Sequence, residues 1–401
     1  MVNFVFLSVY FYSVPNLRFN NDPYKKYNLY EFATRVTRKN KDNVSNLPLT
    51  ISAQYGLVDQ VSFFNKTVAS KDMSGYYLLK NGEFAYNKSY SNDYPWGAIK
   101  RLDLYDMGCL STLYICFKTN DNIVNSNYLV HYFESSKWHK QVADIAGEGA
   151  RNHGLLNIVV NDFFNTKHAV PTIENQIKIA GFLDLIEKRI QTQIKIINSI
   201  ESQIRAINNH IASDSTSSEL NIASLFHVKT SNKLVESNTG KFCIVDMGTI
   251  DANGNYITGK YTDDETSLIP YGTLVMPKDD IGGGKIICKT MCINSSNKYA
   301  LSDHVFALKL KNDKYNPVYF SALINSQYNN HKLKKLVTGS AQLGINQENL
   351  NRYKLKFSDS LELQHKYSEI IVRLNEELII EKRLLDLFSS QKKYLLKNMF
   401  V

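Results

Sequence analysis

Two stretches of helical heptad pattern constrain the fold of this chain more than any other feature of its sequence. The first lies between about Pro171 and Ala212 and contains no internal proline. Its apolar residues recur every seven positions, at Leu183, Ile190, Ile197, Ile204 and Ile211, with a companion row at Ile186, Ile200 and Ile207. Such a seam lets a helix lie along a partner helix with knobs-into-holes packing. The stretch therefore predicts one long helix with a buried edge.

The second stretch, from about Leu361 to Met399, repeats the first at a fixed distance of 188 residues. The positions equivalent to the two apolar rows are Ile371, Leu378, Leu385, Lys392 and Met399, and then Leu374, Phe388 and Leu395. A polar residue interrupts the companion row at matching places, Gln193 and Glu381, and Gln364 matches Gln176. Heptads alone are common, but heptads in register with their flanks indicate an internal duplication.

A globular region precedes each predicted helix. Both regions contain short stretches rich in Tyr, Phe, Val and Ile between turn residues, which is typical of strands, and short helices are expected at about 127–141 and 316–337. A polar run at 213–218 predicts a hinge. We therefore expect an α/β (α+β) protein with two similar globular domains. The expected boundaries are 1–169 for the first domain, 170–213 for its helix, 214–358 for the second domain and 359–401 for the second helix.

The heptad seam leaves the partner of each helix open. It suits either a pairing between the two helices of one chain or a coiled coil that dimerises two chains. The duplication favours pairing within the chain, because each helix then has a matching partner in the same molecule. The residues expected to form this helix pairing are Leu183, Ile190, Ile197, Ile204, Ile371, Leu374, Leu378 and Leu385.

Charge and composition limit the class of partner. A formal net charge of +9 and a pI near 9.0 suit a polyanion, most simply nucleic acid, although ribosomal and membrane-surface proteins show the same balance. No segment approaches eighteen uninterrupted apolar residues, so we expect no membrane span, and the apolar start MVNFVFLSVYFYSVP lacks the basic region of a signal peptide. The five cysteines are scattered and form no C-x-x-C pair, so we expect no disulfide framework. Free cysteines are typical of a reducing compartment, and we therefore expect the protein in the cytoplasm.

A search for catalytic motifs yields no candidate. The run from Ile281 to Ile286 resembles a phosphate loop, but it lacks the upstream glycine, and Ile286 stands where Ser or Thr should hold magnesium. A flexible turn is the better interpretation. The N-P-P-aromatic motif of amino-methyltransferases, the Glu-x-Lys of metal nucleases and the G-x-S-x-G elbow do not occur. We therefore expect no catalytic residue, no metal site and no cofactor in this chain.

Basic residues mixed with amides and aromatics are the positive signal. Residues 332–356 carry six Lys or Arg against the single acid Glu348, and residues 18–41 carry seven against two acids. Cations neutralise phosphates, while amide, carboxylate and guanidinium groups read base edges. For any single residue of this kind, a solvated loop position is the simpler interpretation. The argument for DNA binding therefore depends on the whole group of residues. The candidate DNA-binding residues are Asn87, Lys88, Tyr90, Asn92, Tyr94, Arg151, Asn152 and His153 in the first domain, and Lys278, Asp279, Asp280, Lys285, Ser340 and Gln342 in the second.

Several segments resemble one known family along nearly the whole chain. The run from Val14 to Phe19 looks like that family's start, VPTIENQIKIAGFLDLIEKRIQTQIKIINSIESQIRAI like its central helix, and QKKYLLKNMF like the end of its second helix. The loop from Gly339 to Gln342 also recurs in it. On these residues the chain resembles the specificity subunit of Type I restriction–modification systems. It departs from the pattern where the second helix opens at Leu361 without the usual proline-rich lead-in.

The resemblance implies a mechanism and a set of partners. Two target-recognition domains would enter the major groove of double-stranded DNA at the two halves of an interrupted site, separated by helices that pack antiparallel with pseudo-two-fold symmetry. Two modification subunits would bind S-adenosylmethionine and methylate adenine, and restriction subunits would add ATP- and Mg-dependent translocation and cleavage. The chain itself would be a non-catalytic recognition subunit.

Two alternatives stay open on the sequence alone. A divergent single-chain DNA nuclease or methyltransferase would show activity when the purified chain receives a metal ion or S-adenosylmethionine. A sequence-blind coiled-coil adaptor would bind DNA in a way that depends on salt but not on base sequence.

Overall fold

The computed structural model describes residues 24–52, 54–66, 69–91, 94–147, 154–214, 218–257, 259–340 and 342–400. These residues form two compact units, Met1–Thr192 with Leu385–Val401, and Gln193–Leu384. We call them unit 1 and unit 2 and describe each by itself. The apolar start of the chain lies outside the described residues.

Unit 1 contains a four-stranded antiparallel sheet in the order β2-β9-β6-β7, with shorter strand pairs around it. Its strands are β1 Lys25–Asn28, β2 Ala33–Arg35, β3 Leu49–Ser52, β4 Gly56–Asp59, β5 Tyr77–Lys80, β6 Phe84–Asn87, β7 Ala98–Arg101, β8 Met107–Leu110, β9 Ile115–Thr119 and β10 Lys167–Val170. Its short helices are α1 Leu29–Phe32, α2 Gln60–Phe64, α3 Ser126–Glu134, α4 His139–Ile145 and α5 Val160–Phe164, with a 3₁₀ turn at Lys41–Asn43. The mixed α/β architecture expected from the sequence is confirmed.

Unit 2 contains a second four-stranded sheet, in the order β12-β19-β15-β17, and a three-stranded sheet, β14-β13-β18. Its strands are β11 Ser218–Asn221, β12 Phe226–Lys229, β13 Phe242–Val245, β14 Tyr261–Thr262, β15 Leu274–Pro277, β16 Asp279–Asp280, β17 Met291–Cys292, β18 Tyr299–Leu301, β19 Val305–Leu310, β20 Leu343–Gly344 and β21 Lys354–Phe357. Its short helices are α7 Ile222–Leu225, α8 Pro317–Asn325, α9 Gln327–Lys334 and α10 Gln347–Arg352, with a 3₁₀ turn at Met247–Thr249.

The two units repeat one plan at the level of individual hydrogen bonds. Strand β1 pairs antiparallel with β10, and β11 pairs antiparallel with β21, in the same four-residue register. The backbone nitrogen of Leu29 donates to the carbonyl of Thr166 at 2.9 Å, and that of Ile222 donates to Tyr353 at 2.9 Å. The four-stranded sheets have equivalent orders as well. The internal duplication inferred from the heptads therefore extends into the globular parts.

The matched glutamines show the duplication most directly. Gln176 is buried, its side-chain oxygen accepts from the backbone of Asn125 at 2.8 Å, and its amide donates to the carbonyl of Pro171 at 2.9 Å. Gln364 is buried and makes the same two bonds, to Asn316 at 3.0 Å and Ser358 at 2.8 Å. Asn125 and Asn316 are the N-caps of α3 and α8. Each glutamine thus joins a long helix to the start of a domain helix.

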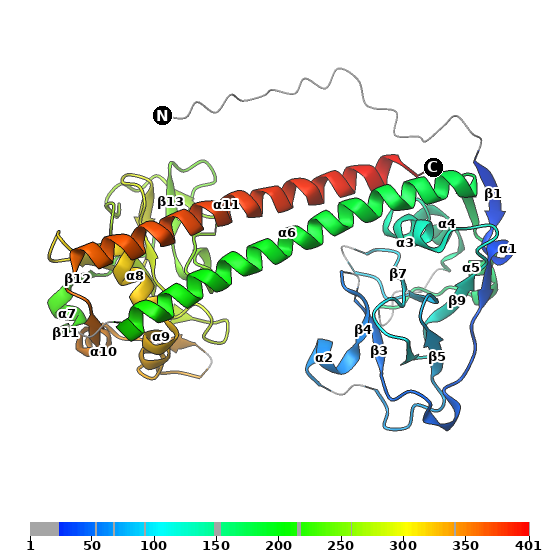
Figure 1. Cartoon of the computed structure of the whole chain (residues 1–401), viewed down its shortest axis with the longest axis horizontal. Coiled ribbons are helices and arrows are strands. Elements are labelled where there is room, and N and C mark those ends of the chain that lie inside the picture. The colour runs from blue at the N-terminus through cyan, green and yellow to red at the C-terminus, as the bar shows by residue number, and fades with distance from the viewer. Residues whose placement is uncertain are drawn as a thin grey trace, which may run out of the picture. The chain divides into compact units, whose positions relative to one another are not determined.

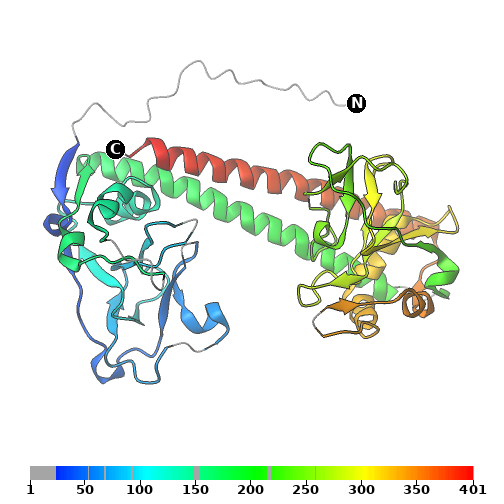
Figure 2. The same ribbon diagram turned by 180° about the vertical axis from the view of Figure 1, so that it is seen from behind.

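Two long helices, α6 Ile173–Asp214 and α11 Leu361–Asn398, lie side by side (Figures 1 and 2). In unit 1, Lys392 of α11 pairs with Glu187 of α6 at 2.8 Å. In unit 2, the amide of Gln193 donates to the backbone carbonyl of Glu381 at 3.1 Å, and the Tyr367 hydroxyl donates to Asp214 at 3.2 Å. Later residues of α6 contact earlier residues of α11, so the helices are antiparallel.

The heptad seam is covered in both units. Leu183, Ile190, Ile197, Ile371 and Leu378 are buried, while Ile204, Leu374 and Leu385 are half-buried. The helix ends also enter the domain cores: in unit 1 Leu183 and Leu395 join an aromatic-rich cluster, and in unit 2 Ile211 and Ile371 join another. In each unit, parts of both helices therefore share a hydrophobic cluster with the domain.

Candidate DNA interface

In unit 2 two loops that are distant in sequence meet through the strand pair β16–β20. Asp279 lies opposite Gly344 in this pair, and Ile345 donates its backbone hydrogen to the carbonyl of Lys278 at 2.9 Å. The second loop closes on itself, with two backbone bonds of 2.9 and 2.8 Å between Thr338 and Gly344. The structure therefore brings together the second-domain candidates, Lys278, Asp279, Asp280 and Lys285 from one loop and Ser340 and Gln342 from the other.

Asp280 does not face solvent, and its candidacy as a base-reading residue is corrected. Only 1% of its surface is exposed, and its carboxylate accepts backbone bonds from Gly282, Ile286 and Ile287. Burial disfavours the charged form, but these backbone donors outweigh it and lower the pKa of Asp280. The residue lies beneath the loop and holds it. The segment from Ile281 to Ile286 is a turn, as expected, but it is fastened rather than flexible.

Glycine is required at one position of the second loop. Gly339 has φ +97°, and a Cβ atom there would overlap the carbonyl oxygen of Gln342. A side chain would be strained at this φ, so the loop depends on the glycine. Ser340 and Gln342 beside it are exposed. The sequence motif Gly339–Gln342 thus has a conformational cause.

Asp279 is held by a histidine that the sequence did not single out. Its carboxylate oxygen lies 2.9 Å from Nδ1 of His304, and Nε2 of the same ring lies 3.7 Å from Asp303. Lys278, next in the chain, is half-buried, and its backbone donates to the carbonyl of His304 at 3.0 Å. A carboxylate is suited to accept a hydrogen bond from a base amino group and is poorly suited to meet a phosphate.

In unit 1 the candidates that the structure describes, Asn87, Lys88, Tyr90 and Tyr94, lie on or beside one loop. The loop after β6 runs beside residues 154–156: Tyr90 donates its backbone hydrogen to Gly154 at 3.1 Å, and Leu156 donates to Lys88 at 2.9 Å. The side chain of Asn87 accepts from the backbone of Ser89 at 3.0 Å. Tyr90 is exposed and Tyr94 is half-buried. The candidates Asn92, Arg151, Asn152 and His153 lie outside the described residues.

Part of the basic segment at 18–41 serves the fold instead of a surface. The Arg38 guanidinium binds Glu83 at 2.7 Å and the carbonyl of Leu78 at 3.0 Å. Lys39 donates to the carbonyl of Gly75 at 2.8 Å and lies over the ring of Tyr77. Charge counts along the sequence therefore overstate the cations that this segment can offer to DNA.

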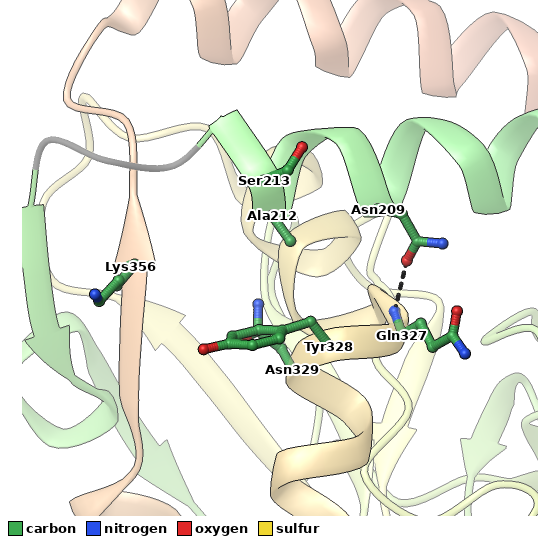
Figure 3. Close-up of a pocket in the computed structure, with 7 residues that line it drawn as sticks. All are labelled: Asn209, Ala212, Ser213, Gln327, Tyr328, Asn329 and Lys356. Carbon is green, nitrogen blue, oxygen red and sulfur yellow. Dashed lines mark hydrogen bonds between the residues drawn. The ribbon is translucent and has the colours of Figure 1, made fainter.

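A hollow of about 620 Å³ lies in unit 2 where α6 ends (Figure 3). Its lining residues are Asn209, Ala212, Ser213, Gln327, Tyr328, Asn329 and Lys356. Two of the first backbone N–H groups of α9 bind side chains, because Gln327 donates to Asn209 at 2.7 Å and Asn329 donates to Ser326 at 3.3 Å. The bond from Gln327 links α9 to α6 beside the hollow.

The structure offers no metal centre within the described residues, where no three His, Cys, Asp or Glu side chains gather suitably. The five cysteines are free, and burial raises the pKa of Cys288 and Cys292 to about 12, which keeps both thiols neutral. Among the described residues no helix is apolar over a length that could cross a bilayer.

Two α/β domains that repeat one plan, each with a long paired helix, define the class of duplicated two-domain proteins to which this fold belongs. Residues 216–387 match the family model of the Type I restriction modification DNA specificity domain. A search of curated protein sequences finds no match.

Solved structures with the same fold cover nearly the whole chain. The S subunit of a Type I restriction–modification system from M. genitalium is 14% identical, with a TM-score of 0.60 over 97% of this chain and 99% of that one. A structure reported for complex assembly and conformational transition of the type I R-M system is 12% identical, with a TM-score of 0.53 over 93% and 96%. The chain therefore shares the fold of these structures, and residues 216–387 are similar to the DNA specificity domain of Type I restriction–modification systems.

Proposed function

We propose that this chain is the specificity subunit of a Type I restriction–modification system and recognises a bipartite site in double-stranded DNA, with one half-site read by each domain. The recognition domains are assigned to residues 1–169 and 214–358, and the spacer helices to 170–213 and 359–401. The observation that carries the proposal is the duplication, because two copies of one reading module suit two half-sites. The antiparallel helices α6 and α11 then set the spacing between these half-sites, as dimer geometry does in symmetric regulators.

The DNA-reading surface of each domain is proposed to be its converging loop pair. In the first domain this surface comprises Asn87, Lys88, Tyr90, Asn92, Tyr94, Arg151, Asn152 and His153. In the second it comprises Lys278, Asp279, Lys285, Ser340 and Gln342, with Asp280 beneath them. Lysines supply salt-dependent affinity for phosphates, and the amides and Asp279 supply the direction that base reading needs.

The partners are proposed to be two modification subunits that dock on the long helices, with restriction subunits completing the complex. Apolar side chains are exposed on both helices within the described residues, at Ile177, Leu185 and Ile196 on α6 and at Val372, Ile379 and Leu387 on α11. An exposed apolar row on a helix is suited to a partner protein. S-adenosylmethionine, ATP and Mg would then belong to the partners, and the complex would act in the cytoplasm.

A domain exchange tests the proposal. Replacing residues 1–169 by the equivalent domain of another specificity subunit should change one half of the methylated motif and leave the other half intact. Inserting one heptad into either helix should lengthen or abolish the permitted spacer without changing the half-sites. A change in both halves, or in neither, would refute modular reading.

The two alternatives give different results in the same assays. A divergent enzyme would cleave or methylate DNA as the purified chain. A sequence-blind adaptor would select no preferred site from random DNA.

A further inference from the structure

We propose that Ile281 determines specificity by contacting the 5-methyl group of a thymine in the major groove of the second half-site. The inference rests on the proposed function and goes beyond it, because it assigns one side chain to one chemical group of one base. No polar candidate could make this contact.

Ile281 is an exposed apolar side chain at the start of a glycine-rich loop. It is 65% exposed and opens the loop Ile281–Ile286, where Gly282 and Gly283 are also exposed. Lys285 follows in the same loop and is exposed. Exposure of an apolar side chain of this size to water is unfavourable, and a partner that covers it gains the free energy of burying that surface. Since the proposed partner is DNA, the group that Ile281 contacts must be an apolar part of a polyanion.

The loop is held in one conformation before any ligand arrives. The buried carboxylate of Asp280, directly before Ile281, accepts backbone bonds from Gly282, Ile286 and Ile287. From the other side, the Lys334 ammonium donates to the carbonyl of Gly284 at 2.6 Å. A loop that is already ordered loses little conformational entropy on binding. Such a loop is suited to a contact that distinguishes one base from another. Asp280 is therefore a positioning residue for Ile281.

The chemistry of the groove selects thymine. Against the DNA backbone, an isoleucine side chain would contact only charged phosphates and hydrophilic sugars, which offer it little favourable apolar contact. On the base edges of the major groove, the thymine methyl is the apolar feature that distinguishes one base pair from the others, and aliphatic side chains contact it. Insertion of the side chain between stacked bases is the rival geometry, and it would be insensitive to the methyl group.

Another exposed apolar residue of unit 2 provides the contrast. Val235 is 82% exposed, more than Ile281, but it lies between Leu234 and Glu236, away from the strand pair β16–β20 in sequence and in pairing. Exposed apolar residues that occur singly are ordinary on protein surfaces. Position on the fastened loop, and not exposure, is what singles out Ile281.

The test replaces the thymine methyl group by hydrogen. The full chain, assembled with its modification subunits, first selects its site from random duplexes. Each thymine of that site is then replaced in turn by deoxyuridine, and affinity is measured at fixed salt. Wild type should lose affinity about fourfold at one thymine of the second half-site, the effect of one buried methyl group. Ile281→Ala should bind the thymine duplex about fourfold more weakly and should not distinguish it from the deoxyuridine duplex.

The controls separate this inference from the function on which it rests. Val235→Ala should keep wild-type affinity and the wild-type preference for thymine, and Asp280→Asn should reduce the preference to below twofold. A second half-site without an A·T pair, or an Ile281→Ala variant that still prefers thymine, overturns the role of Ile281. A full preference in Asp280→Asn overturns the positioning role of that residue. Failure of the wild-type complex to select any site would instead refute the proposed function.

Discussion

The two halves of the chain share their scaffold but differ in the polar groups buried within it. Equivalent glutamines, Gln176 and Gln364, make equivalent bonds. At another pair of equivalent positions, however, the second residue of β10 is His168 and that of β21 is Leu355. Likewise Lys392 in unit 1 stands 188 residues after Ile204 in unit 2. The side chains that both halves share stabilise the common fold, and the side chains found in one half alone give that half its own polar interactions.

The largest such difference is an ion cluster found in unit 1. Lys392 lies 3.1 Å from Glu134 of α3 and 2.8 Å from Glu187 of α6, and Lys100 also binds Glu134. Burial disfavours the charged form of Glu134, but the two lysines lower its pKa to about 2. In a duplicated molecule each helix has a near copy with which it could mispair. A partly buried charge that is matched in one arrangement disfavours the others.

Replacing Lys392 by methionine should have the largest effect on this asymmetry. The change leaves Glu187 and Glu134, which are partly exposed, without their shared cation. Breaking a fully buried ion pair costs about 3 kcal/mol or more. Because solvent screens these carboxylates in part, we expect a cost of about 2–3 kcal/mol. We expect the loss in unit 1, measured by hydrogen exchange of residues 24–192, with residues 218–357 protected as before.

The matched control is Ile204→Met, at the equivalent position of the other long helix. A volume-conserving apolar change there should cost less than about 1.5 kcal/mol. Neutralising the carboxylates as well, in Lys392→Met with Glu134→Gln and Glu187→Gln, should recover part of the loss. Equal destabilisation by Lys392→Met and Ile204→Met would show that the cluster contributes no more than packing.

Much of this architecture follows from the sequence, because periodicity and register are local properties of the chain. The heptads predict the two helices, and the offset of 188 residues is enough to match Gln176 with Gln364. The cluster around Lys392 could not be found in this way, since Glu134 lies on a short helix whose contact with α11 depends on tertiary packing. The sequence predicts a surface position for Asp280, because aspartate beside lysine and glycine is typical of exposed loops. Its burial depends on backbone donors that a sequence does not locate.

The glutamine pair provides the next prediction, where the halves should behave alike. Gln176→Ala removes the acceptor for the backbone of Asn125 and the donor to Pro171, which leaves buried groups without partners. Gln364→Ala does the same to Asn316 and Ser358. Each change should cost about 2 kcal/mol, in unit 1 and unit 2 respectively. Hydrogen exchange at the first turns of α3 and α8 would measure it.

Unequal costs would limit the comparison between the halves. If Gln176→Ala destabilised unit 1 while Gln364→Ala left unit 2 unchanged, the shared geometry would not reflect a shared energetic role. A double variant provides the control, since the two sites share no partner and their costs should add.

His168 and Leu355 give the most specific prediction, a pH dependence that unit 1 should show and that the equivalent position of unit 2 should not. His168 is buried between the hydroxyls of Tyr132 and Thr166, at 2.9 and 2.8 Å, and burial lowers its pKa to about 4. The unfolded chain therefore takes up this proton near pH 6.5 and the folded chain only near pH 4. Stability is full above about pH 6.5 and falls as pH decreases through that window, by about 2 kcal/mol at pH 5.

His168→Leu, which copies the residue of the other half, should remove this dependence. The variant loses the two hydroxyl contacts and should be somewhat less stable than wild type at pH 7, but its stability should fall about 2 kcal/mol less between pH 7 and pH 5. His131 and His139, whose pKa values burial also lowers, remain in both proteins, so the difference isolates His168. Glu134, whose pKa is about 2, loses its contribution only below about pH 4.5, outside this window. Denaturant unfolding at the two pH values measures the effect, and an unchanged pH dependence in the variant would mean that the proton is taken up elsewhere in unit 1.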